Sequence, residues 1–357
     1  MNDERWMREA LKLARNGIAT SHPNPRVGAV VIRNNQVVGR GWHTAPGEAH
    51  AEIMALADAG EAANGATLVV TLEPCSACGR TAPCTEAVVA AAINRVVFGS
   101  HDINPAMAGG GKLLADHGVT VTAGVLAEEC DLLNRPFFHG LQQHRPWIVA
   151  KAATSLDGNL ATAGGDSRWI SNPAARKQAH RLRAEVDAII IGAGTLRCDN
   201  PQLTPRGVRR RGEAPLRVVI CRTLPQFKTD YHLANIGEAA TRIYSQQLTD
   251  DAMEWQEAGV EIVTYSTLHE IAAHLYTNGD LLVMVEGGGE LYGALLRAQL
   301  IDEMVLFQAP LLIGGERAVH LWGGDGSTRV ANAPRMINIK RRSLGDNQMI
   351  RGELIYP

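Results

Sequence analysis

The spacing of His50, Cys75 and Cys84 constrains the fold of this chain more than any other feature of the sequence. One imidazole and two thiolates form a zinc ligand set that leaves the fourth position of a tetrahedral site open for water. Glu52 follows the histidine by two residues, and we expect it to carry protons rather than to bind the metal. The sequence therefore predicts a local structure that brings these four side chains together.

The residues around the ligands favour a helix, a strand and a second helix in that order. Apolar residues at helical spacing follow His50 over residues 53–57, and residues 66–72 form an apolar run typical of a buried strand. Residues 85–93 form a second helical run, so Cys84 stands at a helix N-terminus, where the helix dipole favours its thiolate. The order H-x-E and then P-C-x-x-C is the signature of zinc nucleobase deaminases. We predict a catalytic zinc site, because a structural site needs a fourth ligand and no second C-x-x-C or H-x-H stands nearby.

Two cysteines compete for the role of the third ligand. Counted from Cys75, Cys78 satisfies P-C-x-x-C literally, whereas Cys84 lies further along the chain. Cys84 directly opens the second helical run, while Cys78 is followed by the loop 79–83, which cannot open a helix. We therefore prefer Cys84 to Cys78 as the ligand.

Length, charge and cysteine content limit the class of protein. At 357 residues the chain is longer than most single cores, so we expect two domains. A net charge of −2 argues against a dedicated polyanion binder, and we expect a small-molecule substrate rather than nucleic acid. The charged N-terminus has no apolar signal core, no apolar run spans a membrane, and six cysteines are too few for a disulfide framework. These features predict a cytoplasmic protein with no membrane partner, and they leave a homo-oligomer open.

The first half, residues 1–143, has the pattern of a three-layer α/β/α domain. We expect a first helix over residues 6–14 and a hairpin of strands 27–32 and 37–42, joined at Asn34-Asn35. After the metal segment we expect a strand at 95–98, a helix at 113–117, a strand at 119–121 and a helix at 127–134 that Pro136 stops. The stretch 142–146 then has the composition of a link between domains.

Three features of this half have two interpretations each. Asn24 can bind a substrate ribose or amide, or it can cap a turn. His43 can be a hydrogen-bonded structural residue, which is the commoner role of a lone histidine, or a catalytic group. The glycine run 109–111 can cradle a phosphate, although such a run alone is weak evidence.

The second half, residues 146–357, alternates strands and helices and predicts a second α/β sheet domain. The expected strands are 147–153, 186–191, 217–220 and 281–285, and the expected helices are 171–185, with Ser171 as N-cap, and 291–298. Glycine turns follow two of these strands, at 192–194 and 287–289, and they indicate either a nucleotide or phosphate site or simply tight turns. The strict G-x-G-x-x-G fingerprint is absent. A basic cluster at Arg206 and 209–211 is either a solvated loop or, through Arg206, a phosphate ligand.

Both halves together resemble the bifunctional deaminase–reductases of riboflavin biosynthesis over nearly the whole chain. In the first half the resemblance rests on the motifs Pro23-Asn-Pro-Arg-Val-Gly28, His50-Ala-Glu52, Thr71-Leu-Glu-Pro-Cys75 and Gly79-Arg-Thr-Ala-Pro-Cys84. In the second half it rests on Ser155-Leu-Asp-Gly158, Gly165-Asp-Ser-Arg-Trp-Ile170, Asp199-Asn-Pro201 with Leu203-Thr204, and Val285-Glu-Gly-Gly288. The resemblance implies a cytidine-deaminase-like domain followed by a dihydrofolate-reductase-like domain. It also implies zinc-hydroxide deamination of 2,5-diamino-6-(ribosylamino)pyrimidinone 5′-phosphate, and then NADPH reduction of its ribosyl chain to ribityl.

The resemblance also assigns roles to single residues. It makes Glu52 the proton shuttle and His50, Cys75 and Cys84 the zinc ligands. The positions that match the substrate site of the reductase are Ser167, Arg183, Leu203, Arg206 and Glu286. The positions that match its cofactor site are Ala153, Trp169, Thr195, Asp199, Gly288 and Gly289.

The chain departs from the family pattern at three places. Ala77 stands where the family usually has His, Cys78 follows it, and Cys221-Arg222 replaces the usual Asp-Ser/Thr. Arg222 can pair with the 2′-phosphate of NADP. For the proton donor of the reduction, Lys151 and Asp157 are the candidates.

Two rival functions differ from this expectation in class. A nucleic-acid or nucleotide deaminase with an appended nucleotide-binding domain would share the zinc site but needs a basic surface studded with aromatic residues. Only 5% of the residues are aromatic, which disfavours it. A non-catalytic scaffold with a structural zinc and a regulatory nucleotide domain is the other rival, and the presence of Glu52 disfavours it.

Overall fold

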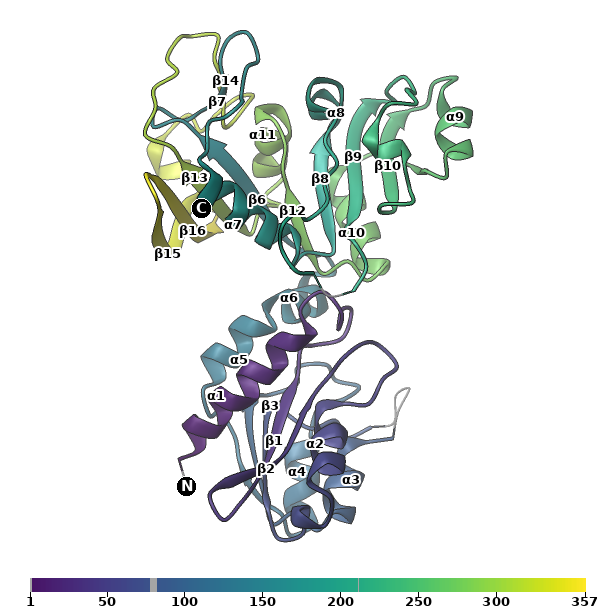
Figure 1. Cartoon of the computed structure of the whole chain (residues 1–357), viewed down its shortest axis with the longest axis vertical. Coiled ribbons are helices and arrows are strands. Elements are labelled where there is room, and N and C mark those ends of the chain that lie inside the picture. Colours follow the sequence, from purple (N-terminus) through teal and green to yellow (C-terminus); the bar gives the residue numbers. More distant parts are fainter. Residues whose placement is uncertain (1, 78–81, 211) are drawn as a thin grey trace. The chain divides into compact units, whose positions relative to one another are not determined.

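The computed structural model describes residues 2–77, 82–210 and 212–357, and the chain forms two compact units, Met1–His144 and Arg145–Pro357 (Figure 1). Each unit is built on its own sheet, with separate hydrophobic clusters on the two faces of that sheet. The α/β fold class predicted from the sequence is confirmed for both units.

The sheet of the first unit has five strands in the order β2-β1-β3-β4-β5. β1 is antiparallel to both β2 and β3, whereas β4 and β5 continue the sheet in parallel. The expected hairpin is present, and Asn34 and Asn35 at its tip have φ of 51° and 59°, as a type I′ turn requires. The strands are β1 (Gly28–Arg33), β2 (Gln36–Trp42), β3 (Thr67–Leu72), β4 (Arg95–Ser100) and β5 (Thr120–Thr122).

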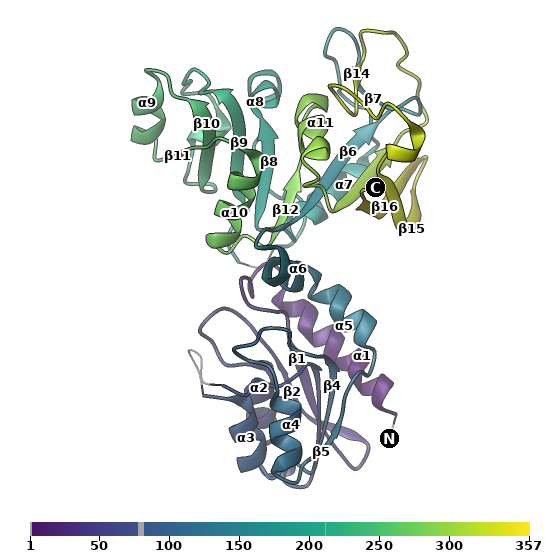
Figure 2. The same ribbon diagram turned by 180° about the vertical axis from the view of Figure 1, so that it is seen from behind.

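Helices cover both faces of this sheet, which makes the three-layer α/β/α arrangement that the sequence predicted. In Figures 1 and 2, α1 (Asp3–Ala14) and α5 (Ala127–Leu133) lie on one face. The opposite face carries α2 (Ala51–Ala59), α3 (Cys84–Ala90) and α4 (Gly110–Asp116). The zinc-ligand segments therefore belong to the second of these layers.

The helix predicted over residues 127–134 is confirmed as α5, which ends at Leu133 before Pro136. A further helix that was not predicted, α6 (Arg135–Gln143), begins directly afterwards and contains Pro136 in its first turn. A proline is tolerated in the first turn of a helix, where its missing N–H has no intrahelical partner to lose. Residues 142 and 143, expected in the link between the units, belong to α6.

The second unit is built on a nine-stranded sheet in the order β11-β10-β9-β8-β12-β6-β13-β16-β15. Along this spatial order, every strand from β11 across to β13 runs parallel to its neighbours. The hairpin of β16 and β15 then adds an antiparallel edge next to β13. The parallel strands are β6 (Trp147–Thr154), β8 (Ala188–Gly192), β9 (Leu216–Thr223), β10 (Thr241–Gln247), β11 (Glu261–Thr264), β12 (Leu282–Val285) and β13 (Glu303–Gln308). The hairpin is β15 (Arg335–Leu344) with β16 (Asn347–Ile355), and β7 (Asn159–Ala161) pairs separately with β14 (Val319–His320).

Helices pack on both faces of the large sheet. Leu182, Leu196 and Trp255 join one hydrophobic cluster, from α7 (Pro173–Arg183), α8 (Ala193–Asp199) and α9 (Ala252–Glu257). The other cluster contains Leu275 and Leu295, from α10 (Leu268–Thr277) and α11 (Gly289–Arg297). The four expected strands are confirmed as β6, β8, β9 and β12, whereas β10, β11, β13 and the β15–β16 hairpin were not predicted.

The cap of α7 also differs from the prediction. Asn172, not Ser171, is its N-cap, because the Asn172 side chain accepts the N–H of Ala175 at 2.9 Å. No helix in the described parts of the chain is long and apolar enough to cross a membrane.

Gly28 gives a stability prediction for the first unit. A Cβ at this position would lie 2.1 Å from the carbonyl oxygen of Ala10 and 2.5 Å from the backbone nitrogen of Ala14, so α1 packs directly on β1 there. We expect Gly28→Ala to destabilise this unit by about 1–3 kcal/mol through overpacking. Chemical denaturation followed by circular dichroism measures this loss. Gly194→Ala is the control, since a Cβ at Gly194 meets no atom within 4 Å, and an equal effect of both variants would contradict the packing argument.

Candidate zinc centre and candidate reductase site

The helix–strand–helix segment of the first unit brings the predicted metal ligands together. His50 is the N-cap residue of α2, and Glu52 lies in the first turn of that helix. Cys75 follows the end of β3, and Cys84 is the first residue of α3. The backbone N–H of Cys84 donates to the Sγ of Cys75 at 3.3 Å, which fixes the two cysteines relative to one another.

The geometry of these donors suits a zinc ion. The Nδ1 of His50 lies 3.2 Å from the Sγ of Cys84 and 3.6 Å from the Sγ of Cys75, and all three ligand atoms are within 4.8 Å of one another. Tetrahedral zinc with its usual bond lengths places neighbouring N and S ligands roughly 3.5 Å apart. Among the described residues this is the single cluster of three or more such side chains with metal-binding spacing. Three protein ligands leave one coordination position for a water molecule.

Glu52 is a buried carboxyl group beside this cluster. It is 4% exposed, and burial raises its pKa to about 7. A hydrogen bond from the Cys84 thiol opposes this rise. The pKa of Cys75 is lowered, first by the hydrogen bond with Cys84 and also by His50. The site therefore combines a thiolate that can bind metal with a carboxyl group that can hold or release a proton.

Asn24 and His43, which the sequence left with two interpretations each, form one hydrogen-bonded pair. The Nδ2 of Asn24 lies 3.0 Å from the Nε2 of His43, and the Nδ1 of His43 lies 3.3 Å from the carbonyl oxygen of Ala49. His43 is buried, which lowers its pKa, and its ring stands edge-on to that of His50 with centroids 5.5 Å apart. A neutral ring that accepts from Asn24 and donates to Ala49 satisfies both nitrogens. This pair therefore orients the residue immediately before His50.

The glycine run after β4 has a packing role. Glu73, in the turn that leads to Cys75, accepts the backbone N–H groups of Asp102 and Gly111 at 3.2 and 2.9 Å. A Cβ at Gly110 would lie 1.8 Å from the carbonyl oxygen of Pro74. The start of α4 is thus packed against the metal-binding turn, which accounts for the glycines without a phosphate. The rival ligand Cys78 lies outside the described residues.

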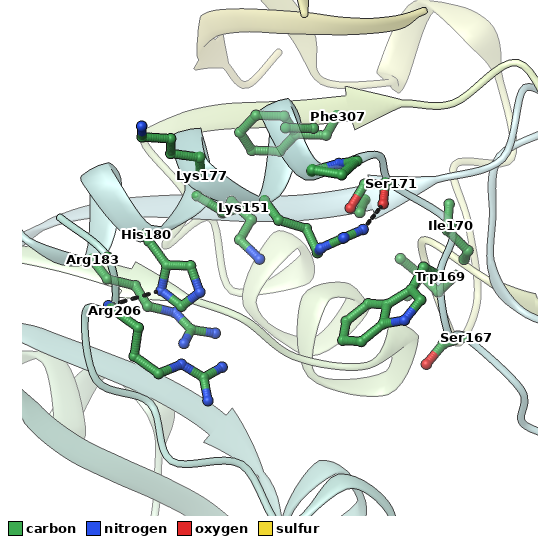
Figure 3. A pocket seen from close by; sticks show the side chains of 17 residues that line it. Lys151, Ser167, Trp169, Ile170, Ser171, Lys177, His180, Arg183, Arg206 and Phe307 are labelled. Atoms are coloured by element: carbon green, nitrogen blue, oxygen red, sulfur yellow. Dashed lines mark hydrogen bonds between the residues drawn. The ribbon is translucent and has the colours of Figure 1, made fainter. Parts of the chain in front are cut away.

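The second unit contains a cavity of about 630 Å³ beside α7 and the end of β6 (Figure 3). Of the predicted residues, Ala153, Ser167, Trp169, Arg183 and Arg206 line it. Lys151, the candidate proton donor, also lines it. Further lining residues that the sequence analysis did not single out include Arg176, Lys177, His180 and Phe307. The lining is strongly cationic and suits an anionic ligand.

A buried ion network stands at one wall of this cavity. Glu286 accepts Lys151 Nζ at 2.9 Å, and Arg183 Nε and Nη2 at 2.6 and 2.8 Å. Burial alone would raise the pKa of Glu286, but the charges of Arg183 and Lys151 outweigh it and hold this pKa well below its usual range. The carboxylate is therefore ionised, and it fixes two cations at the cavity wall.

The remaining predicted residues lie outside the cavity lining. Leu203 is buried in a hydrophobic cluster at 1% exposure. Thr195 and Asp199 lie in α8 after β8, and Arg222 is exposed near the end of β9. Gly288 caps α11 and Gly289 begins it, directly after β12. Thr195, Asp199, Gly288 and Gly289 follow the carboxyl ends of β8 and β12, and Arg222 lies just before the carboxyl end of the neighbouring β9. This is the edge of an α/β sheet where ligands bind.

The basic cluster after β8 divides into two roles. Arg206 faces the cavity, whereas Arg210 donates to the carbonyl groups of Val186 and Arg183 at 2.9 and 3.3 Å and so serves the local fold. Arg209 is exposed, and Arg211 lies outside the described residues. A helical pattern in α7 is the sequence signal that was missed: Arg176, His180 and Arg183 recur at helical spacing on its polar side.

Comparison with known protein families defines the class of both units. The cytidine and deoxycytidylate deaminase zinc-binding region matches residues 1–100, and the RibD C-terminal domain matches residues 146–347. The first unit is thus a zinc-binding deaminase domain with a His/Cys/Cys cluster, and the second is a pyrimidine reductase domain.

Full-length relatives narrow this class. The chain is 39% identical to riboflavin biosynthesis protein RibD of Bacillus amyloliquefaciens, covering 94% of this chain and 91% of the relative. It is 38% identical to RibD of Escherichia coli strain K12, covering 94% and 95%. A solved structure of Acinetobacter baumannii RibD matches with a TM-score of 0.89 and 33% identity over 99% of both chains. A diaminohydroxyphosphoribosylaminopyrimidine deaminase/5-amino-6-(5-phosphoribosylamino)uracil reductase of Thermotoga maritima matches with a TM-score of 0.88 and 31% identity, again over 99% of both. The chain therefore belongs to the RibD family, the deaminase–reductases of riboflavin biosynthesis.

Metal content tests which cysteines bind zinc. We expect Cys84→Ala to lose most of the bound zinc, because two protein ligands hold zinc much more weakly than three. Elemental analysis of the purified, dialysed protein gives the zinc-to-chain ratio.

Two variants serve as matched controls for that loss. Cys78→Ala removes the rival ligand, and Cys130→Ala removes a buried thiol that packs with α1 on the opposite face of the same sheet. Both are expected to keep their zinc. If Cys84→Ala kept its full zinc content and Cys78→Ala lost it, the third ligand would be Cys78 and not Cys84.

Proposed function

We propose that the first unit deaminates 2,5-diamino-6-(ribosylamino)pyrimidinone 5′-phosphate, and that the second reduces the ribosyl chain of the product to ribityl with NADPH. The observation that carries the proposal is the buried Glu52 beside three convergent ligands that leave a metal position open. A phosphorylated pyrimidine riboside also suits a cationic cavity of about 630 Å³ in the second unit.

In the deaminase unit, His50, Cys75 and Cys84 would hold the zinc ion. Zinc lowers the pKa of its water from about 15.7 to about 7, which supplies a nucleophile at neutral pH. Glu52 accepts a proton from the attacking water and returns it to the departing amine, so that water is consumed and ammonia is released. His43, held by Asn24 and by the Ala49 carbonyl, keeps the residue before His50 in place.

In the reductase unit, Arg183 and Arg206 bind the substrate phosphate, since guanidinium groups match phosphate oxygens well. NADPH supplies the hydride. Lys151 is the proton donor for opening the sugar ring, because its ammonium group lines the cavity and is held by Glu286. Asp157 is unsuited to that role: hydrogen bonds from Ser155 and from the N–H groups of Gly314 and Ile313 hold its pKa well below the usual range. It therefore has no proton to give.

The cofactor site proposed for NADPH follows the carboxyl edge of the large sheet. Ala153 and Trp169 stand in the cavity, where the reactive ends of cofactor and substrate must meet. Thr195, Asp199, Gly288 and Gly289 follow the adjacent strands, and the N–H groups at the start of α11 suit the pyrophosphate. Arg222, exposed near the end of β9, is proposed to bind the 2′-phosphate.

The substrate is proposed to be a free nucleotide and not nucleic acid. The net charge of −2 is not that of a dedicated polyanion binder, and Lys151, Arg176, Lys177, Arg183 and Arg206 line one cavity of a size that suits a small molecule. A cytoplasmic location is proposed because all five described cysteines are free, as in a reducing compartment.

Glu52 gives the sharpest test of the deamination. We expect Glu52→Gln to lower the rate of ammonia release from the diaminopyrimidinone ribotide by 100-fold or more, roughly the contribution of one general acid–base group. Zinc content should stay at the wild-type level, because Glu52 is not a ligand. Near-normal ammonia release would refute the assignment.

Lys151 gives the matching test of the reduction. We expect Lys151→Met to abolish NADPH oxidation with the aminouracil ribotide while ammonia release in the first step stays normal, because the proton donor is lost only in the second unit. Absorbance at 340 nm follows NADPH. Lys177→Met removes another cation from the cavity lining and is the control, so an equal loss in both variants would show an effect of charge alone.

A further inference from the structure

His180 is a cavity residue to which neither the sequence motifs nor the resemblance assigns a role. It lies in α7 one turn before Arg183, is half-buried, and lines the proposed reductase cavity. Figure 3 shows its ring beside the guanidinium groups of Arg183 and Arg206, on the side where the Lys151 side chain ends. Its surroundings are therefore the cations proposed to bind the substrate phosphate.

One hydrogen bond defines the protonation of this ring. The backbone N–H of Arg206 points to the Nδ1 of His180 at 3.2 Å. A backbone N–H can only donate, so Nδ1 must accept and carries no proton. The proton of the neutral ring is therefore on Nε2.

Burial and the cations that face the ring both favour its neutral form. Burial lowers the pKa of His180, and Arg183, Arg206 and Lys151 lower it further, opposed by the single carboxylate of Glu286. A neutral histidine with a fixed tautomer is a hydrogen-bond donor on one side and an acceptor on the other.

The donor side of the ring is available to a ligand. In the described parts of the chain, the only hydrogen bond of the His180 side chain is the one to Arg206, which uses Nδ1. Figure 3 shows the second ring nitrogen turned away from the Arg206 backbone, towards the space beside Lys151. An N–H there can reach the phosphate that Arg183 and Arg206 are proposed to bind.

We propose that His180 is a substrate-binding residue that donates its Nε2–H to the phosphate of the reductase substrate, and that through Nδ1 it also positions Arg206. The proposal rests on the reductase function proposed above. Because the cavity already holds several cations, an uncharged donor adds a hydrogen bond to the phosphate without adding repulsion among them. The anchored backbone of Arg206 fixes the start of a long side chain whose Nη1 is also held by Gln202 at 2.7 Å.

Two substitutions separate these two roles. In His180→Asn, the amide oxygen takes the place of Nδ1 and still accepts the Arg206 N–H, while nothing replaces the Nε2–H. His180→Ala removes both groups. We expect His180→Asn to raise the KM for the aminouracil ribotide on the order of 10- to 100-fold, the value of one hydrogen bond to a charged group, with little change in kcat. His180→Ala should raise it further, because Arg206 is then no longer anchored.

A substrate without a phosphate tests whether the hydrogen bond lost in His180→Asn was made to the phosphate. With the dephosphorylated aminouracil riboside, wild-type and His180→Asn should have the same KM, whereas the inhibition constant of inorganic phosphate should rise in the variant. An unchanged KM for the ribotide, or an equal rise with the riboside, would overturn the proposal. If the wild-type protein oxidised no NADPH with the ribotide, the proposed reductase function itself would be wrong. If the wild-type protein were active and the His180 variants had the same KM, only the role of His180 would be wrong.

Discussion

The first unit depends on the close approach of two sulfur atoms, a ring nitrogen and a buried carboxyl group. Without a cation, two thiolates beside Glu52 would repel one another and each would lose its hydration. The fold nevertheless brings them together with three separate elements: the cap of α2, the turn after β3 and the start of α3. A divalent metal ion turns this repulsion into attraction, which is why binding the metal and folding the site are linked.

The two units place a buried glutamate in opposite electrostatic states. For Glu52, burial outweighs the attraction of the neighbouring His50 ring, so its pKa is raised to about 7 and the group can exchange a proton near neutrality. Glu286 is also largely buried, with 9% of its side chain exposed, but it touches Arg183 and Lys151, so it stays ionised and serves as a fixed anchor. The same residue type thus acts as proton carrier in one site and as a holder of cations in the other, and its neighbours alone make the difference.

Much of the fold and of the zinc site could be predicted because their signals are local in sequence. Apolar periodicity gave the helices and strands around His50, and Asn34-Asn35 fixed the hairpin. Other features depend on tertiary contacts. Strand β10 contains the buried Arg242, which pairs with Glu261 of the neighbouring strand, so its sequence lacked the apolar run of a parallel strand.

Helix ends and long-range pairs were harder to predict. Ser171 and Asn172 are both good N-caps by type, and only the structure shows which side chain reaches Ala175. The pairs Asn24–His43 and His180–Arg206 join residues 19 and 26 positions apart, and no periodicity reports such contacts. The residues of the reductase site were therefore assigned by resemblance rather than by pattern.

The central claim is that one chain carries a hydrolytic and a reductive site for successive steps. The most direct measurement supplies wild-type protein with the diaminopyrimidinone ribotide, with and without NADPH, and follows ammonia release and NADPH oxidation separately. We expect ammonia release in both cases, and one NADPH oxidised for each ammonia released when the cofactor is present. NADPH oxidation without ammonia release, or no ammonia release from zinc-loaded protein, would contradict it.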